Sequence, residues 1–150
     1  MIQNYNHKIR LRACGICIEN NQILLVKHIG LGNPHFWSPV GGGVEFGETA
    51  QNALKREFLE ESNLQIEVIR FLFVNEFVAP PLHAIELFFE VQIIGGTLKT
   101  GIDPEQEQQI ISEVRFLSFE EIKAEKQGCV HKIFHFCQNL NDLLKIESLI

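Results

Sequence analysis

The sequence predicts one α/β or α+β domain over residues 1–150, in which helices pack on a mixed β-sheet. A chain of 150 residues is long enough for one domain with a sizeable core. Runs rich in β-branched and aromatic residues alternate with runs of helical periodicity. Hydrophobic residues make up 45% of the chain and charged residues 21%, which is typical of a globular protein.

The N-terminal third predicts strands followed by a glycine-rich loop. Residues 9–18 and 22–28 are strand-like runs separated by the polar turn Glu19-Asn20-Asn21, so we expect a hairpin. Residues 29–47 contain six of the eleven glycines and two of the five prolines. We therefore expect this segment to be mostly loop.

The middle of the chain predicts a helix and two long strands. Residues 48–62 show helical periodicity, and Asn63 can end that helix in the left-handed conformation. Residues 65–79 and 83–94 are strand-like and are separated by Pro80-Pro81, which cannot continue either strand.

The last third predicts a strand and two helices. Residues 100–109 form a polar loop and 113–117 a short strand. Ser118 and Glu121 have the spacing of a capping box, which predicts a helix start. The C-terminal segment places an apolar stripe at helical spacing: Ile133, Phe136, Leu140 and Leu144.

Charge and hydropathy exclude several functions. Thirteen Lys and Arg against nineteen Asp and Glu give a formal net charge of −6, and no basic run forms a nucleic-acid-binding surface. No stretch is apolar for long enough to span a bilayer, so no membrane partner is expected. The segment Met1–Arg12 lacks the apolar core of a secretory signal, which indicates a cytoplasmic protein.

The four cysteines include Cys14-x-x-Cys17, a spacing found in zinc and redox sites. On a strand, however, positions three apart point to opposite faces. A C-terminal segment that we expect to be helical contains four residues that could complete a zinc site on paper: Cys129, His131, His135 and Cys137. Residues two apart on a helix do not face each other, so we expect reduced thiols and no structural zinc.

The residues with the clearest chemical pattern lie between Trp37 and Leu64. A glycine-rich turn, Gly41-Gly42-Gly43, lets backbone approach a ligand or metal closely. On the following helix, three carboxylates share one face at i, i+3 and i+4: Glu57, Glu60 and Glu61. They repel one another unless a cation lies among them, and hard carboxylate oxygens suit Mg²⁺ or Mn²⁺. The alternative is a solvated acidic face.

The spacing from Gly42 through Glu48, Arg56-Glu57 and Glu60-Glu61 to Leu64 resembles the Nudix box. Three positions depart from the family pattern. Asn63 replaces the usual glycine, Phe58 is bulkier than the usual aliphatic residue, and Pro39-Val40 stands where Leu-Pro is frequent. None of the departures removes an acid.

The resemblance implies a Nudix-like α/β/α sandwich and a role for each matching residue. Glu57, Glu60 and Glu61 would bind Mg²⁺ or Mn²⁺, with the Gly41 or Gly42 carbonyl as a further ligand. Arg56 would orient the helix acids, and Glu48 would support the loop. Gly42 and Gly43 would contact substrate. Separately from the resemblance, His28 at the end of the predicted strand 22–28 is a candidate to line the substrate site, and a packing or surface role suits it at least as well. The family often supplies another acid from a late loop, here Glu105 or Glu107, and the sequence does not choose between them.

The same resemblance implies a hydrolase that splits the pyrophosphate bond of a nucleoside diphosphate linked to another moiety. Pro80, sixteen residues after Leu64, is similar to a marker of the ADP-ribose branch. A nucleoside triphosphate pyrophosphohydrolase and a non-catalytic nucleotide sensor are the alternatives. The expected partner is a small nucleotide, and the sequence leaves a homodimer open.

Overall fold

Two β-sheets organise the chain, and the computed structural model describes residues 7–29, 34–101 and 111–150 of it. The first sheet has the strand order β5-β1-β7-β6, and the second has β2-β3-β4 with β8 paired to β3. The strands are β1 Arg10–Ile16, β2 Ile18–Glu19, β3 Gln22–His28, β4 Phe36–Pro39, β5 Gly41–Gly43, β6 Leu64–Ala79, β7 Leu82–Gly96 and β8 Ile111–Ser118. The helices are α1 Ala50–Ser62, α2 Phe119–Ala124 and the 3₁₀ helices η2 Lys132–Phe136 and η3 Leu140–Lys145.

The first sheet is mixed, as the sequence predicts. Strand β1 runs parallel to β7 and antiparallel to β5, while β6 and β7 are antiparallel. In this register Arg12 lies between Gly43 of β5 and Glu86 of β7. A polar position in the middle of the sheet is thereby set next to the glycine-rich strand.

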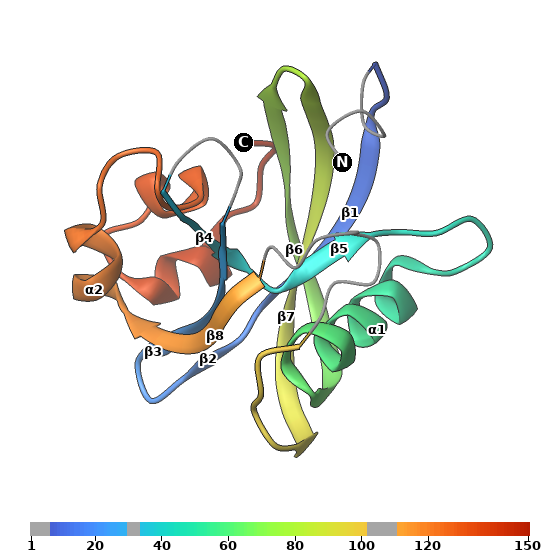
Figure 1. Ribbon diagram of the computed structural model, residues 1–150, viewed down its shortest axis with the longest axis horizontal. Coiled ribbons are helices and arrows are strands. Elements are labelled where there is room, and N and C mark those ends of the chain that lie inside the picture. Colours follow the sequence, from blue (N-terminus) through green and yellow to red (C-terminus); the bar gives the residue numbers. More distant parts are fainter. Residues whose placement is uncertain (1–6, 30–33, 102–110) are drawn as a thin grey trace.

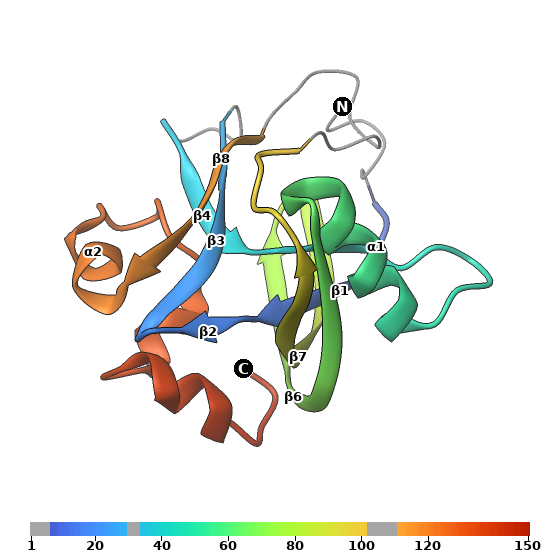
Figure 2. The ribbon, with the colours of Figure 1, turned by 90° about the horizontal axis from the view of Figure 1, so that it is seen from below.

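Helices lie on both sides of the first sheet (Figures 1 and 2). Helix α1 covers one side, and the second sheet, α2 and the C-terminal 3₁₀ helices lie on the other. The core divides accordingly into two hydrophobic clusters. Phe88 belongs to the cluster with the C-terminal helices, and its neighbour Phe89 belongs to the cluster with α1, because successive strand residues point to opposite faces.

The predicted N-terminal hairpin is wrong in its pairing. Only β2 pairs with β3, joined at Ile18 and Ile23, whereas β1 belongs to the first sheet. The chain leaves one sheet and enters the other at Cys17. The reason is that β1 is an inner strand of the first sheet, paired with β5 and β7, and both faces of that sheet are covered. Its apolar residues therefore alternate between the two clusters.

The glycine-rich segment is more regular than a loop, which corrects a second expectation. Strand β4 pairs with β3, and β5 pairs with β1. Gly41 lies so close to β1 that a Cβ would collide with the Ala13 carbonyl and the Cys14 thiol. Glycine is therefore needed for this strand pairing, and its presence is not a sign of irregular structure here.

Helix α1 begins and ends as its sequence dictates. The Thr49 hydroxyl accepts a hydrogen bond from the Asn52 amide (3.1 Å), which satisfies a first-turn donor. Asn63 ends the helix with φ 61° and ψ 23°, the left-handed conformation that the sequence predicts. Leu54 and Phe58 are fully buried on the face toward the sheet.

The later strands and the capping box are confirmed. Strands β6 and β7 form a long hairpin that turns at Pro80-Pro81, and Ser118 caps α2 together with Glu121. The edge of β6 is partly covered by the C-terminus, where the Ile150 amide donates to the Val74 carbonyl (2.9 Å). Most of the predicted loop 100–109 lies outside the described residues.

The C-terminal segment is not one α-helix but two 3₁₀ helices, η2 and η3. Ile133 and Leu140 are buried as expected, whereas Phe136 is 56% exposed. Helical periodicity alone does not distinguish a continuous helix from two short helices that each bury one side. No helix within the described part of the chain is long and apolar enough to cross a membrane.

All four cysteines carry free thiols. Cys14 and Cys17 lie in different hydrophobic clusters, as strand geometry predicts. Cys129 precedes η2 and Cys137 follows it, so the expectation of a helix through both residues is wrong.

Candidate active site

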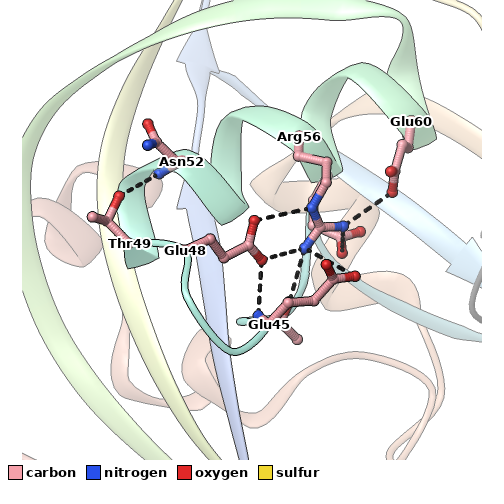
Figure 3. Close-up of polar contacts among 8 residues, drawn as sticks. Glu45, Glu48, Thr49, Asn52, Arg56 and Glu60 are labelled. Atoms are coloured by element: carbon pink, nitrogen blue, oxygen red, sulfur yellow. Dashed lines mark hydrogen bonds and ion pairs between the residues drawn. The ribbon is translucent and has the colours of Figure 1, made fainter.

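The centre of the site is Arg56, whose guanidinium ties the glycine-rich strand to α1 (Figure 3). It donates two hydrogen bonds to Glu48, of 2.7 and 3.2 Å, and one of 3.0 Å to the Gly43 carbonyl. It also donates to Glu57 (2.8 Å) and, more weakly, to Glu60 (3.3 Å). Five hydrogen bonds use the donor capacity of a guanidinium fully.

The turn before α1 is built to present Glu48 to this arginine. The Glu45 amide donates to the Glu48 carboxylate (2.8 Å), and the Glu48 amide donates back to the Glu45 carbonyl (3.1 Å). Thr49 then begins the helix. These local bonds hold the turn closed, so that Glu48 can reach Arg56, which lies eight residues further along the chain.

The pKa values of Arg56 and Glu48 reflect the attraction between their opposite charges. The hydrogen bond with Glu48 is the largest influence that raises the pKa of Arg56, and the bond with Glu57 adds to it. In return, the hydrogen bond from Arg56 lowers the pKa of Glu48. Both groups remain charged at neutral pH.

The three helix acids differ in exposure. Glu57 and Glu61 are buried, with 2% and 3% exposed, whereas the Glu60 side chain is 27% exposed. The Glu57 carboxylate lies directly against Gly42, where a Cβ would collide with it. The solvated-face alternative therefore does not describe Glu57 or Glu61.

Carboxylates of this kind fit a hard divalent cation chemically. In residues 7–29, 34–101 and 111–150, no three acids, histidines or cysteines are already grouped at metal-binding distance. Glu57 and Glu60 instead both contact Arg56 Nη1. The residues that could hold an ion are the two buried acids with Glu60 at the rim, beside backbone that glycine leaves bare.

A second polar cluster lies on the face of the first sheet that carries Phe88, and its residues are not among the site residues predicted from the sequence. Glu86 is only 1% exposed, and its carboxylate accepts three short hydrogen bonds. The donors are Arg12 Nη1 (2.8 Å), Asn75 Nδ2 (2.9 Å) and His131 Nε2 (2.7 Å). The Arg12 Nη2 group then reaches the Gly41 carbonyl (3.3 Å), which connects this cluster to the glycine-rich strand.

The hydrogen bonds assign the protons in this cluster. His131 Nδ1 accepts from the Ile133 amide (3.2 Å), so the ring proton must lie on Nε2 and point to Glu86. Burial alone would raise the pKa of Glu86. The bond from His131, the charge of Arg12 and the bond from Asn75 outweigh burial and lower this pKa to about 2.

A parity signal in the sequence could have revealed the cluster. Glu86 lies in phase with Ala84 and Phe88, and Asn75 lies in phase with Phe73, all of them buried. A polar residue in phase with the apolar face of a strand must be buried, and a buried polar group needs partners. The identity of those partners could not be predicted, because Arg12 and Glu86 are 74 residues apart.

His28 is the last residue of β3 and pairs with Phe36 of β4. Its Nε2 forms a 3.1 Å hydrogen bond with the Ser38 hydroxyl, and its Nδ1 is buried without a hydrogen-bond partner among the described residues. Burial, helped by the positive charge of Arg12, lowers the pKa of His28 to about 4. The ring is therefore neutral at neutral pH and lies within electrostatic range of Arg12.

The structure brings the predicted helix acids, Arg56 and the glycine-rich strand together. The two candidate bases, Glu105 and Glu107, lie outside the described residues. The segment leading toward them is anchored to the end of α1, where the Gly101 amide donates to the Glu61 carbonyl (2.8 Å). A Cβ at Gly101 would collide with the Glu60 backbone, so this close approach requires glycine.

Sequence comparison identifies relatives of known name. Residues 9–134 match the NUDIX domain model. An ADP-ribose pyrophosphatase of Methanocaldococcus jannaschii is 33% identical over 94 residues, which cover 61% of this chain and 56% of that protein. An NAD-capped RNA hydrolase, NudC, of Pectobacterium carotovorum subsp. carotovorum is 32% identical over 84 residues, covering 54% of this chain and 30% of that protein. The chain thus matches about half the length, or less, of these curated relatives.

Solved structures share the fold. A NUDIX hydrolase from Nitrosomonas europaea superposes with a TM-score of 0.73 at 20% identity, covering 87% of this chain and 86% of that one. An ADP-ribose pyrophosphatase from Streptococcus suis superposes with a TM-score of 0.63 at 16% identity, covering 93% of this chain and 97% of that one. Together with the match over residues 9–134, the α1 acids and the mixed sheet show that the chain belongs to the NUDIX domain family.

Proposed function

We propose that the chain is a metal-dependent hydrolase that cleaves the pyrophosphate bond of a nucleoside diphosphate linked to another moiety. The observation that carries this proposal is the Arg56 cluster, which holds Glu48, Glu57 and Glu60 beside the glycine-rich strand. An assembly of buried carboxylates is costly without a function that uses their charge.

An ADP-ribose-like substrate is favoured. Its support is the relative named ADP-ribose pyrophosphatase, with Pro80 as a minor second indication. The NudC relatives act on NAD-capped RNA according to their name, and such a cap also contains a pyrophosphate bond between two nucleosides. The shared chemistry is therefore a pyrophosphate with organic groups at both ends.

The metal proposed for this site is Mg²⁺ or Mn²⁺. Glu57, Glu60 and Glu61 would hold it, with the Gly41 or Gly42 carbonyl as a further ligand. When bound, such an ion polarises phosphate oxygens and makes water a better nucleophile. Burial of Glu57 and Glu61 strengthens their attraction for a cation, because the surrounding protein screens charge less than water does.

The chain's own residues would orient the reaction. Arg56 fixes the Glu57 carboxylate, and Glu48 fixes Arg56. Gly42 and Gly43 expose backbone to the substrate, and His28 contacts it from β3. In the reaction, a water oxygen bonds to one phosphorus, the bridging P–O bond breaks, and the proton passes to a base. Glu105 and Glu107 are the candidates for that base, and two phosphate monoesters leave.

Two other functions remain as alternatives. A nucleoside triphosphate pyrophosphohydrolase would use the same acids and release inorganic pyrophosphate. A nucleotide sensor would bind without cleaving, but it would not need the acids to be held as Arg56 holds them. The proposal also includes a cytoplasmic location, a small-molecule partner and a homodimer, the last testable by light scattering.

A substrate panel with product identification tests the proposal. ADP-ribose, NAD, a dinucleoside polyphosphate and the nucleoside triphosphates are each incubated with Mg²⁺, with Mn²⁺ and with excess chelator. We expect ADP-ribose to yield AMP and ribose 5-phosphate only when metal is present. Release of inorganic pyrophosphate from a triphosphate alone would favour the first alternative. Binding without any cleavage would favour the sensor, and cleavage in chelator would refute metal dependence.

A further inference from the structure

Arg12 is the second arginine that contacts the glycine-rich strand. Arg56 donates to the Gly43 carbonyl from the α1 side, and Arg12 donates to the Gly41 carbonyl from β1. Their engagement differs. Among the described residues, Arg56 makes five hydrogen bonds, whereas Arg12 makes one short bond, to Glu86, and one long bond of 3.3 Å.

The Nη2 group of Arg12 is therefore only loosely held. Charge-assisted hydrogen bonds between nitrogen and oxygen are usually about 2.7–2.9 Å long. The Arg12 Nε–H is buried without a hydrogen-bond partner in the described part of the chain, and 22% of the side chain is exposed. Arg12 thus keeps unused hydrogen-bonding capacity beside the Gly41 carbonyl, a proposed metal ligand, whereas Arg56 uses all five of its N–H groups.

Arg12 also lies within the electric field of those acids. Burial opposes its charge, but nearby negative groups outweigh burial and raise its pKa above the usual value; they include Cys14 when ionised, Glu86, Glu61 and Glu57. The Arg12 guanidinium, at the Gly41 carbonyl, is within electrostatic range of Glu57 and Glu61, so a pyrophosphate held by a metal at those acids would come near it. It is suited to the task, because a planar guanidinium matches phosphate oxygens in geometry.

The cluster around Glu86 fixes this arginine. Glu86 cannot turn away from Arg12, because His131 and Asn75 hold its other oxygen. Both holding groups are buried, with His131 2% and Asn75 0% exposed. An arginine at a site that binds phosphate gains precision from such support, since less conformational entropy is lost on binding.

We infer that Arg12 contacts a phosphate of the substrate and that Glu86 is the positioning residue that holds Arg12 in place. This inference rests on the proposed function and adds to it a phosphate-binding residue outside the box. A different role for Arg12 would be structural: a tie between the glycine-rich strand and Glu86. That role predicts weaker metal binding when Arg12 is lost, because the Gly41 carbonyl would lose its support.

The two roles are separated by binding measurements that need no turnover. Calorimetry measures the affinity for imidodiphosphate, a non-hydrolysable pyrophosphate analogue, at saturating Mn²⁺. Electron paramagnetic resonance measures the affinity for Mn²⁺ alone. For Arg12→Gln we expect imidodiphosphate to bind about tenfold to a hundredfold more weakly, as loss of a charged hydrogen-bonding group predicts. Mn²⁺ binding should be unchanged or tighter, since a cation leaves the acids. Arg12→Lys should recover part of the imidodiphosphate affinity.

Glu86→Gln tests positioning, and Arg70→Gln is the control. Arg70 also pairs with a glutamate of β7, at 2.7 Å, and its other hydrogen bond in the described part of the chain goes to the Leu144 carbonyl. Glu86→Gln should weaken imidodiphosphate binding severalfold, and the Arg12→Gln, Glu86→Gln double variant should bind no worse than Arg12→Gln, because Glu86 acts through Arg12. Arg70→Gln should bind as the parent does.

Any of three results would overturn the inference. Arg12→Gln could bind imidodiphosphate as tightly as the parent does, it could lose Mn²⁺ binding in parallel with imidodiphosphate binding, or the losses of affinity could be additive in the double variant. If Arg12→Gln does not fold, unchanged imidodiphosphate binding in both Arg12→Lys and Glu86→Gln would overturn it equally. Failure of the parent to cleave any nucleotide would refute the proposed function alone, since the binding measurements do not depend on cleavage.

Discussion

Replacing Arg56 by lysine tests whether this residue holds the site together. Arg56 donates five hydrogen bonds, and a lysine ammonium can donate at most three. At least two charge-assisted bonds are lost, each worth about 1.5–3 kcal/mol. Since 24% of the Arg56 side chain is exposed, solvent screening reduces the sum, and we expect a loss of about 2–4 kcal/mol.

Thermal and urea unfolding measure this loss. For a domain of this size, about 2–4 °C of melting temperature corresponds to each kcal/mol, so Arg56→Lys should melt roughly 5–15 °C below the parent. Arg70→Lys is the matched control, because Arg70 is 53% exposed and pairs with Glu90 at the surface. It should lose about 1 kcal/mol or less. Equal stabilities of Arg56→Lys and Arg70→Lys would refute the role given to Arg56.

Two further predictions concern titratable groups. The pKa of folded His28 is lowered from 6.5 to about 4, so its contribution to stability is complete above pH 6.5 and is lost as the pH falls toward 4. Between pH 7 and 4 the parent should lose up to about 3 kcal/mol more unfolding free energy than His28→Gln, and identical urea-unfolding pH profiles would contradict this. Burial raises the pKa of Cys17 to about 12, that of Cys137 to about 11, and that of Cys14 well above its usual value. The native chain should therefore react slowly with iodoacetamide at pH 8 and contain no stoichiometric zinc. Rapid labelling of two thiols would contradict the first expectation. Stoichiometric zinc that disappears in the Cys14→Ser, Cys17→Ser double variant would contradict the second.

Local patterns in the sequence predict the parts of the fold that depend on neighbouring residues. The end of α1 at Asn63 and the Ser118 capping box are of this kind, because caps are made within a few residues. The two strands around Pro80-Pro81 are also predicted, because proline ends both.

Pairing between distant segments could not be predicted in the same way. The sequence of Gly41–Gly43 predicts a loop, and only the adjacent β1 makes it a strand. The 9–18 segment looks like one strand, but the choice between two sheets at Cys17 depends on which strands lie beside it. Likewise, the C-terminal stripe does not reveal that Phe136 is exposed between two short helices.

The same distinction between local and distant contacts applies to the candidate site. The box acids and Arg56 could be identified from spacing, because all of them lie on one helix and the turn before it. Arg12 and His131 could not, because they meet only at Glu86, far from either in sequence. Nothing local to Arg12 distinguishes it from Arg10, two residues earlier on the same strand.

The central claim is that the box acids serve catalysis, and Glu60→Gln tests it most directly. Turnover of the best substrate is measured at saturating Mg²⁺ for the parent, Glu60→Gln and the control Glu67→Gln, whose side chain is exposed on β6. The Glu60 carboxylate bonds Arg56 only weakly (3.3 Å), so the melting temperature should change little. The rate should nevertheless fall on the order of a hundredfold or more, as expected when a ligand of the activating cation is lost. Glu67→Gln should match the parent, and near-parental turnover by Glu60→Gln would contradict the account.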